Sequence, residues 1–478
     1  MSHSTLPDKK TKIVCTIGPA SQAVEVLERL IAAGMNVARI NFSHGDLDSH
    51  RQAIANVRAA AARVGRRVAI LGDLSGPKMR IGKFAAEPVE LQRDQAFVLQ
   101  IDEIVGDEHR VSMSFPALPK VVRPGDRIFL NDGFIQLQVT AVRDREVACQ
   151  VLVGGELRSH KGVNLPGIDL GISAFTERDR ECLQFAAAER LDAVSQSFVQ
   201  DAYDIAAVRR AADELDYHPL IIAKVERARA VDKLDEILAA ADGIMVARGD
   251  LGVEIPFERV AITQKRMIHQ ANLLGKPVIV ATHMLESMIH NRRPTRAEAS
   301  DVANAILDGT DCVMLSGETA VGEYPEDAVA AMAAIARVTE QEREDHFLAR
   351  LLQLEKVRGE IRREDLVSLT VYLDVETMKP GVVLIPSRSG ATARRVSRFR
   401  LPIWIVAVSE DEAVCQRMQF SYGVFPVCTE DPPNWSHFAV DWVRQYVPAA
   451  EVVLLTREGD ARRERDSTLI EIIDLRPS

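Results

Sequence analysis

The chain has 478 residues, 47% apolar and 27% charged, so it is too long for one ordinary compact domain and predicts two to four soluble domains. Its net charge of -10 argues against broad nucleic-acid binding, which needs a basic surface. We find no apolar run of about 18 residues and no N-terminal signal pattern, so we expect a cytoplasmic protein without membrane contacts.

Short apolar, β-branched runs recur along the chain and predict strands. There are eight, at Lys12–Ile17, Val37–Asn41, Val68–Leu71, Ala193–Phe198, Leu220–Val225, Gly243–Val246, Pro277–Ala281 and Cys312–Leu315. Helical patterns follow most of them, at Val24–Ala33, Glu177–Arg190, Tyr203–Leu215, Val231–Ala240 and Phe257–Leu274. This alternation predicts a parallel sheet. An open doubly wound sheet is compatible with it, but eight units favour a closed (β/α)8 barrel.

One long interval, from Leu74 to about Gly171, contains no convincing helix. Segments of alternating polarity with Gly, Pro and Asp turns, such as Arg123–Gln138 and Val147–Val153, predict a small β domain instead. We assign it residues 77–171, which divides the barrel domain into 1–76 and 172–342. An insertion after the third strand lies on the catalytic face of a barrel, so we expect a lid.

A charged helical stretch at 340–365 leads into a third region, which we bound at 343–478. Strands are predicted at Val382–Ile385, Ile403–Val408 and Val452–Leu455, with helices between them, so a second α/β domain is expected. The segment Asp365–Asp374 is ambiguous, because its β-branched residues favour a strand.

Charged side chains gather just past the carboxyl ends of the predicted barrel strands, where barrel enzymes place their active sites. The cations are Arg39, Arg80, Lys224 and Arg248, and the carboxylates are Asp73, Glu226, Asp250 and Glu318. Glu226 and Asp250 end adjacent strands, close enough to share one hard divalent cation. Singly, each residue has an ordinary explanation: Asp250 could cap a helix after Gly252, and Lys224 and Glu226 could form a structural ion pair. Their concentration on one rim favours a site for phosphate chemistry.

Common nucleotide and metal motifs are absent. The sequence has no Walker loop, no protein-kinase glycine loop and no GxGxxG. The turn Gly249–Gly252 offers backbone N–H groups to an anion, which is weak evidence alone. Six scattered cysteines without a CxxC pair predict free thiols rather than a disulfide framework or a zinc site.

Six stretches resemble signatures of the pyruvate kinase family. They are RINFSHG at 39–45, KGVNLP at 161–166, IAKVE at 222–226, MVARGDLGVE at 245–254, ATHMLESM at 281–288 and MLSGETA at 314–320. The resemblance spans the whole chain and is looser after Thr339. It implies a TIM barrel with an inserted β-barrel domain, a C-terminal α/β regulatory domain in which Asp365–Asp374 is helical, and a homotetramer. The implied glycolytic reaction transfers a phosphoryl group from phosphoenolpyruvate to ADP, giving pyruvate and ATP.

The resemblance also implies residue roles. Lys224, Arg39, Arg80 and Thr282 would be catalytic, with Thr282 near the protonated enolate carbon. The substrate would contact Arg39, Lys224, Arg248, Gly249, Asp250, Thr282 and Ser316. The nucleotide would contact Asn41, His44, Arg80 and Lys161. Glu226 and Asp250 would bind Mg²⁺ or Mn²⁺.

The third-strand motif departs from the common family pattern. Many members have Thr and Glu where this chain has Leu74 and Lys78, and they bind potassium beside residues matching Asn41, Ser43 and Asp73. We expect the Lys78 ammonium to replace that ion, because both are compact single positive charges. Potassium would then not be required. Alternatively, Lys78 faces solvent at the lid hinge.

A loop in the last domain, formed by Ser387, Arg388, Ser389, Gly390, Ala391 and Thr392, resembles the family's phosphate loop for a sugar-phosphate or nucleotide activator. An ordinary capped strand–helix turn is the alternative. The loop at 457–466 lacks the family's glycine-rich pattern, which leaves the activator's identity open.

Two other functions stay open at this point. A magnesium-dependent lyase or aldolase of a 2-oxo acid can share the barrel and the metal site, but Lys161 and Lys224 count against it. A non-catalytic sugar-phosphate sensor would have lost a metal carboxylate or Lys224, whereas this chain keeps Lys224, Glu226, Asp250 and Thr282.

Overall fold

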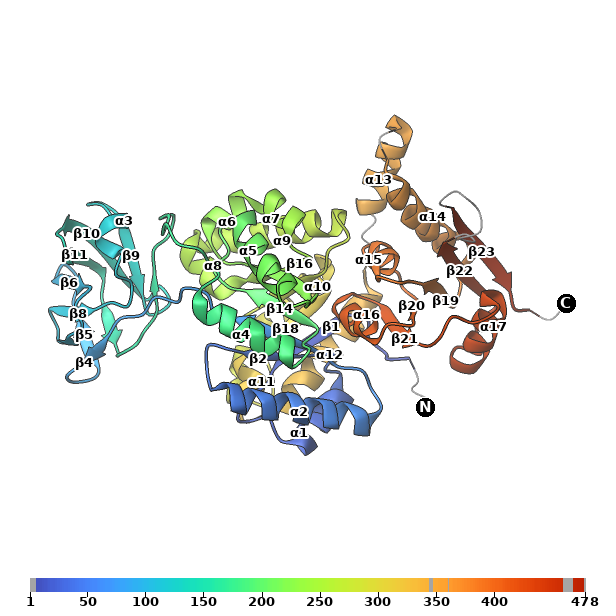
Figure 1. The fold of residues 1–478 in the computed structure, drawn as a ribbon, viewed down its shortest axis with the longest axis horizontal. Helices are drawn as coiled ribbons and strands as arrows, with labels where there is room; N and C mark the ends of the chain where they lie inside the picture. Colours follow the sequence, from blue (N-terminus) through green and yellow to red (C-terminus); the bar gives the residue numbers. More distant parts are fainter. Residues whose placement is uncertain (1–5, 344–346, 360, 459–466, 477–478) are drawn as a thin grey trace.

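The computed structural model describes residues 6–343, 347–359, 361–458 and 467–476. Figure 1 shows a central barrel with the inserted β sheet on one side and the C-terminal sheet on the other. The described N-terminal residues lie beside the C-terminal part. The inserted domain and the C-terminal domain therefore occupy opposite ends of the molecule.

Eight parallel strands close into a barrel, which confirms the predicted architecture and excludes the open sheet. They are β1 (Lys12–Thr16), β2 (Val37–Asn41), β3 (Ala69–Leu74), β14 (Ala193–Gln196), β15 (Leu220–Val225), β16 (Gly243–Ala247), β17 (Val278–Ala281) and β18 (Cys312–Leu315). Around the barrel their order is β1-β18-β17-β16-β15-β14-β3-β2. Each strand is buried on both faces, which explains the continuous apolar runs.

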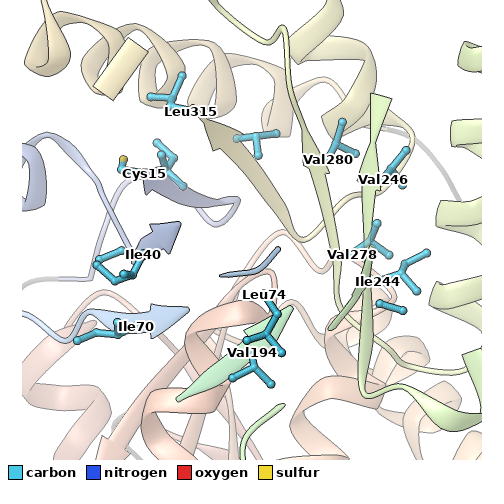
Figure 2. Close-up of a cluster of buried hydrophobic side chains, with 14 of the residues drawn as sticks. Cys15, Ile40, Ile70, Leu74, Val194, Ile244, Val246, Val278, Val280 and Leu315 are labelled. Atoms are coloured by element: carbon cyan, nitrogen blue, oxygen red, sulfur yellow. The ribbon is translucent and has the colours of Figure 1, made fainter. Parts of the chain in front are cut away.

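Alternate residues of each strand belong to two separate cores. The outward residues pack against the surrounding helices; Ile244, Val246, Val278 and Val280 are examples in Figure 2. The inward residues fill the lumen, to which all eight strands contribute: Val14, Val37, Ala69, Leu71, Ala193, Leu220, Ile222, Met245, Ile279, Ala281, Cys312 and Met314. This period of two determines which later residues of each strand point into the lumen.

Helices cover the barrel. They are α1 (Val24–Ala33), α2 (Leu47–Val64), α4 (Glu177–Ala188), α5 (Ala202–Asp213), α6 (Ala228–Asp232), α7 (Leu234–Ala240), α8 (Arg248–Glu254), η1 (Phe257–Arg259), α9 (Val260–Leu273), η2 (Glu286–Ile289), α10 (Arg296–Leu307), α11 (Gly317–Ala320) and α12 (Pro325–Gln341). Asp46, Thr176 and Thr295 cap α2, α4 and α10 with reciprocal side-chain bonds.

Two helical segments differ most clearly from the predictions. The predicted helix Val231–Ala240 is two helices, because Lys233 leaves helical geometry between α6 and α7. Asp250 does not cap a helix after Gly252, since α8 already begins at Arg248 and places Asp250 in its first turn.

The inserted segment is a curled β structure with its own apolar core. Its elements are β4 (Lys83–Phe84), β5 (Val89–Leu91), β6 (Ala96–Gln100), β7 (Val105–Gly106), β8 (Arg110–Ser112), α3 (Leu118–Val121), β9 (Arg127–Leu130), β10 (Ile135–Val142), β11 (Glu146–Val153), β12 (Gly155–Leu157) and β13 (Val163–Asn164). Six strands form one sheet in the order β13-β9-β10-β11-β6-β8. The described part of this segment also contains one helix, the four-residue α3, whereas the sequence predicted none.

The C-terminal part is the predicted α/β domain. It comprises α13 (Phe347–Arg358), α14 (Arg363–Met378), β19 (Val382–Pro386), α15 (Ala391–Ser397), β20 (Trp404–Ser409), α16 (Glu412–Arg417), η3 (Met418–Phe420), β21 (Val424–Cys428), α17 (Trp435–Tyr446), β22 (Val452–Glu458) and β23 (Thr468–Asp474). The sheet order is β21-β20-β19-β22-β23, with only β23 antiparallel. Asp365–Asp374 lies within α14, so the helix implied by the family is correct.

Two sequence expectations concern the chain as a whole. All six cysteines are free thiols, in agreement with the prediction. Among the described helices, none combines the length and apolar character needed to cross a membrane. Of the segments used in the sequence arguments, 1–5, 344–346, 360 and 459–466 lie outside the described residues.

Candidate active site

Because side chains alternate along each barrel strand, the polar residues at the strand ends point into the mouth of the barrel. Leu71 and Ile222 fill the lumen, so Asp73 and Lys224, two residues further along β3 and β15, point the same way. Likewise, Ala193 on β14 is followed by Ser195. The predicted site residues therefore meet because the strands have parallel registers, although they are far apart in sequence.

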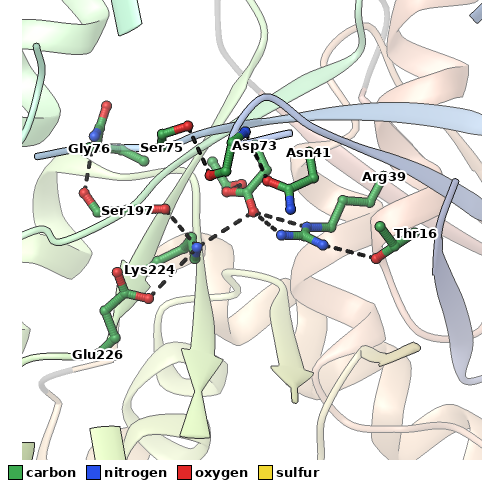
Figure 3. A network of polar contacts seen from close by, with 12 residues as sticks. Thr16, Arg39, Asn41, Asp73, Ser75, Gly76, Ser197, Lys224 and Glu226 are labelled. Carbon is green, nitrogen blue, oxygen red and sulfur yellow. Dashed lines mark hydrogen bonds and ion pairs between the residues drawn. The ribbon is translucent and has the colours of Figure 1, made fainter. Parts of the chain in front are cut away.

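Asp73 is the centre of this network, shown in Figure 3. Its Oδ2 accepts a hydrogen bond of 2.9 Å from Nε of Arg39, and a second, shorter contact comes from Nη2. The Lys224 ammonium lies 3.4 Å from the same oxygen. The other oxygen, Oδ1, accepts a 2.6 Å bond from the Ser195 hydroxyl. Thr16 accepts from Nη1 of Arg39 at 2.9 Å and fixes the far side of the guanidinium.

The charges of this network are strongly coupled. Burial alone would raise the pKa of Asp73, but Lys224 and Arg39 hold it below its ordinary value. Burial likewise acts to lower the pKa of Lys224, and Asp73 and Glu226 outweigh it and raise the pKa. Both groups are therefore charged near neutral pH. Ser197 also accepts a 2.6 Å bond from the ammonium of Lys224, which restricts its position.

One of the two predicted metal ligands, Glu226, has a buried carboxylate oxygen without a hydrogen-bond donor. Glu226 is 1% exposed, and its Oε1 accepts a 2.7 Å bond from the Phe198 N–H. Its Oε2 accepts no hydrogen bond, and the nearest charge is the Lys224 ammonium at 3.7 Å. Burial, together with repulsion from Asp250, raises the pKa of Glu226 to about 7. A buried carboxylate oxygen without a donor, next to a second carboxylate, fits a hard divalent cation.

No group of three or more His, Cys, Asp or Glu side chains that could hold a metal is present in the described part of the chain. A magnesium site need not contain such a cluster, because Mg²⁺ takes one or two protein carboxylates and completes its shell with water and substrate oxygens.

Thr282 and Arg248 order the loop beyond β17. Thr282 has φ of 67°, which is a strained conformation for a β-branched residue. Its hydroxyl accepts a 2.8 Å bond from the Gly249 N–H. The Arg248 guanidinium is turned away, since it bonds Asp301 at 2.8 Å and the carbonyl oxygen of Thr282 at 2.8 Å. The guanidinium is therefore held by protein groups, and the Gly249 N–H is held by the Thr282 hydroxyl.

The residues past β18 are held by Glu318, which the sequence had grouped with the rim carboxylates. Its carboxylate accepts from the N–H groups of Ser316 at 2.6 Å and Leu285 at 3.1 Å. Glu318 therefore joins the loops after β17 and β18, and it positions Ser316.

The predicted nucleotide residues lie where the lid joins the barrel. Arg80 donates to the His160 carbonyl at 2.8 Å, and the Ile81 N–H bonds the Lys161 carbonyl at 3.0 Å, so Arg80 and Lys161 lie on neighbouring lid segments. Burial, followed by the charges of Lys78, Arg80 and Arg39, lowers the pKa of His44.

The predicted monovalent-cation residues are only partly brought together. The Ser43 hydroxyl donates to Ser75 at 2.9 Å, and the Asn41 side-chain oxygen accepts from the Ser43 N–H at 3.2 Å. Lys78 is exposed, and within the described structure no hydrogen bond or ion pair joins it to Asn41, Ser43 or Asp73.

The candidate effector loop joins β19 to α15. Gly390 adopts φ of 74°, and its N–H donates to the Ser387 hydroxyl at 2.9 Å. The Ala391 N–H donates to the Ser389 hydroxyl at 3.4 Å, while Arg388 is exposed and Thr392 follows in the first turn of α15. These bonds are the capping pattern of the ordinary alternative, and they also arrange the loop for a phosphate.

Sequence reasoning missed Ser195, Ser197 and Thr16. A signal for the two serines was present, because they occupy alternate positions of a predicted buried strand, where a hydroxyl needs a partner. That partner could not be identified without the strand registers.

Comparisons with known proteins agree with this geometry. The barrel-domain model of the pyruvate kinase family matches residues 8–329, and its alpha/beta-domain model matches 364–456. A pyruvate kinase of Thermococcus litoralis is 48% identical over 435 residues, which is 90% of each chain. One from Geobacillus stearothermophilus is 46% identical over 89% of this chain and 72% of its own. The crystal structure of a pyruvate kinase from Cryptosporidium parvum superposes with a TM-score of 0.89 at 34% identity, covering 98% of this chain and 96% of that chain.

The two family models together match most of the chain. The alignment with the Thermococcus litoralis enzyme, at 48% identity, covers 90% of that enzyme. The chain belongs to the pyruvate kinase family and is a glycolytic phosphotransferase.

Proposed function

We propose that Arg39 and Lys224 hold the phosphoryl group as it passes from phosphoenolpyruvate to ADP. The observation that carries this proposal is their convergence on one oxygen of Asp73 at the mouth of the barrel. Asp73 balances one of the two positive charges, and the carboxylate of Glu226, 3.7 Å from Lys224, is proposed below as a ligand of the divalent cation. With that cation bound, the pair keeps a net attraction for an anion. Phosphoryl transfer depends mainly on positioning and charge neutralisation, and fixed cations supply both.

Glu226 and Asp250 are the proposed ligands of Mg²⁺ or Mn²⁺, because Oε2 of Glu226 is buried without a donor. A divalent cation there neutralises negative charge developing on substrate oxygens. The N–H groups that open α8, at Arg248 and Gly249, are proposed to hold the substrate carboxylate, which would replace the Thr282 hydroxyl as acceptor of the Gly249 N–H. Thr282 would then face the carbon that is protonated, and Ser316 would border the same space.

The nucleotide is proposed to bind between barrel and lid. Asn41 ends β2 and His44 follows it on the barrel, and Arg80 and Lys161 come from two neighbouring segments of the inserted domain. Lys161 and Arg80 are suited to phosphate oxygens, whose charge they offset. Closure of the lid would bring Lys161 to the nucleotide.

We propose further that Lys78 supplies the monovalent positive charge near Asn41, Ser43 and Asp73. Lys78 follows Ser75 by three residues, and Ser75 is bonded to Ser43. Its charge already acts on His44, next to Ser43. Rotation of the exposed Lys78 side chain is needed to reach the Ser43–Ser75 pair.

The test measures pyruvate formation from phosphoenolpyruvate and ADP with magnesium, in tetramethylammonium buffer, with and without potassium. We expect wild-type turnover to be the same in both buffers, and Lys78→Glu to be at least about tenfold faster with potassium. Lys120→Met, at an exposed lysine of the inserted domain, is the control, and its turnover should be the same with and without potassium.

Each outcome separates the proposals. Wild-type activity only with potassium refutes Lys78 as the replacement cation but leaves the enzyme assignment intact. Equal activity of Lys78→Glu in both buffers also refutes it. Absence of activity in either buffer, with candidate sugar phosphates added, would revive the lyase and sensor alternatives.

Regulation and assembly are proposed from the family resemblance. A sugar phosphate or nucleotide would activate the enzyme at Ser387, Arg388, Ser389, Gly390, Ala391 and Thr392, where two hydroxyls and the start of α15 are already ordered. We also propose a homotetramer and a cytoplasmic location.

A further inference from the structure

The two oxygens of the Asp73 carboxylate have unequal surroundings. Oδ2 holds both cations, Arg39 and Lys224, whereas Oδ1 is bonded by the Ser195 hydroxyl at 2.6 Å. Among the described side chains, Ser195 is the only donor to Oδ1. This one hydroxyl therefore occupies Oδ1 and leaves Oδ2 to the two cations.

Burial makes this hydroxyl hard to replace. Ser195 is fully buried and Asp73 is 2% exposed, so bulk water does not compete for Oδ1. A buried carboxylate oxygen without a donor is costly, and the carboxylate would turn to find one. The available donors are the same two cations, which Thr16 and Ser197 restrain from their far sides while Oδ2 holds them together.

We propose that Ser195 is a positioning residue for phosphoryl transfer. By bonding Oδ1 it fixes the rotation of the Asp73 carboxylate, and the fixed carboxylate holds the Arg39 guanidinium and the Lys224 ammonium at one spacing. This inference rests on the roles proposed above for Arg39 and Lys224. Ser195 itself touches no substrate.

Loss of the hydroxyl should affect catalysis more than binding. Without it, Asp73 can offer one oxygen to each cation, and their spacing changes. Displacement of catalytic groups by about 1 Å can cost about 100-fold in rate. The substrate still meets the same charges in its ground state, so KM should change little.

The experiment compares steady-state kinetics and melting temperatures of four variants. For Ser195→Ala we expect kcat to fall about 10- to 100-fold, with KM for phosphoenolpyruvate within about twofold of wild type. Ser195→Thr keeps the hydroxyl and should recover most of kcat. Ser195→Cys keeps the shape with a weaker donor and should be intermediate.

Ser397→Ala is the matched control for loss of a buried hydroxyl. Ser397 is 1% exposed and donates a 2.6 Å bond to the Tyr422 carbonyl in the C-terminal domain, outside the site. Its kcat should stay at the wild-type value even where its melting temperature falls. A loss of kcat in this control equal to that in Ser195→Ala would reduce Ser195 to a structural role and overturn the inference.

Other results also decide the question. Wild-type kcat in Ser195→Ala overturns the inference, and so does a folded Ser195→Thr no faster than Ser195→Ala. If Ser195→Ala does not fold, the comparison rests on the two other variants. A higher kcat for Ser195→Thr than for Ser195→Cys supports the inference, and the reverse order overturns it. Lys224→Met is assayed in parallel: if it keeps turnover, the proposed role of Lys224 fails, whereas its collapse beside a normal Ser195→Ala refutes only the role of Ser195.

Discussion

At the scale of single residues, the site places opposite charges close together in a setting from which water is largely excluded. Asp73 forms ion pairs with Arg39 and Lys224, and Lys224 in turn lies between Asp73 and Glu226. In such surroundings a fixed charge has a larger effect than in water, because little solvent screens it. The arrangement is thus suited to stabilising charge in a transition state.

Glu226→Gln tests the metal proposal at this scale. Replacing the carboxylate removes a charged oxygen ligand, so we expect the magnesium concentration for half-maximal activity to rise at least about tenfold. Magnesium titrations of pyruvate formation measure this directly. The control is Glu258→Gln, at an exposed position, which should follow the wild-type curve. An unchanged magnesium dependence in Glu226→Gln would remove Glu226 from the metal site.

The sequence could predict which charged residues lie at the mouth of the barrel, because they follow the ends of strands that were identifiable. The hydrogen-bond and ion-pair partners of these side chains could not be predicted from sequence. The sequence placed Arg248 at the substrate, but its guanidinium bonds Asp301, a residue of α10. It also grouped Glu318 with the catalytic rim, whereas Glu318 ties two loops together. Such partners depend on loop geometry that no local pattern reveals.

At the scale of elements, strand limits were predicted closely because burial on both faces produces continuous apolar runs. Val37–Asn41, Leu220–Val225 and Cys312–Leu315 match their strands residue for residue. The limits of short helices were harder to predict from sequence. The predicted helix Val231–Ala240 breaks at Lys233, and α8 begins earlier than expected, because one turn of helix carries too few residues to show a period.

The first strand contains a buried lysine that predicts a pH dependence of stability. Lys12 is 3% exposed, and its ammonium bonds the Val424 carbonyl at 2.7 Å and lies over the Trp404 ring. Burial, followed by repulsion from Lys9, lowers its pKa to about 7 from 10.5. Between these values the unfolded chain binds more protons than the folded one, so this residue makes stability increase as pH rises.

Lys12→Met should remove that contribution. We expect the melting temperature of wild type to rise, relative to the variant, from pH 7 to pH 9. Calorimetry of both proteins at several pH values measures the difference and cancels the titration of other groups. A constant difference across this range would show that Lys12 keeps an ordinary pKa in the folded protein.

At the scale of the whole molecule, Arg400 links the C-terminal domain to the barrel. Its guanidinium bonds Asp311 at 2.5 and 2.8 Å, the Asn272 side chain at 2.8 Å and the Gly309 carbonyl at 2.6 Å. Both charged side chains are almost fully buried. Removing one partner leaves the other charged and buried.

We therefore expect Arg400→Ala to lower the free energy of unfolding by about 3–5 kcal/mol. Arg476→Ala, which breaks an exposed ion pair with Asp474, should lower it far less, because solvent screens the two charges. Denaturant unfolding followed by fluorescence compares the two variants. Equal losses would mean that the Arg400 network contributes no more than a surface pair.

The central claim is that the Lys224 ammonium stabilises the phosphoryl group in transit, and Lys224→Met tests it most directly. Turnover of phosphoenolpyruvate and ADP should fall at least about 1,000-fold, while the melting temperature shows that the variant is folded. A folded Lys224→Met enzyme with near-normal kcat would contradict the account.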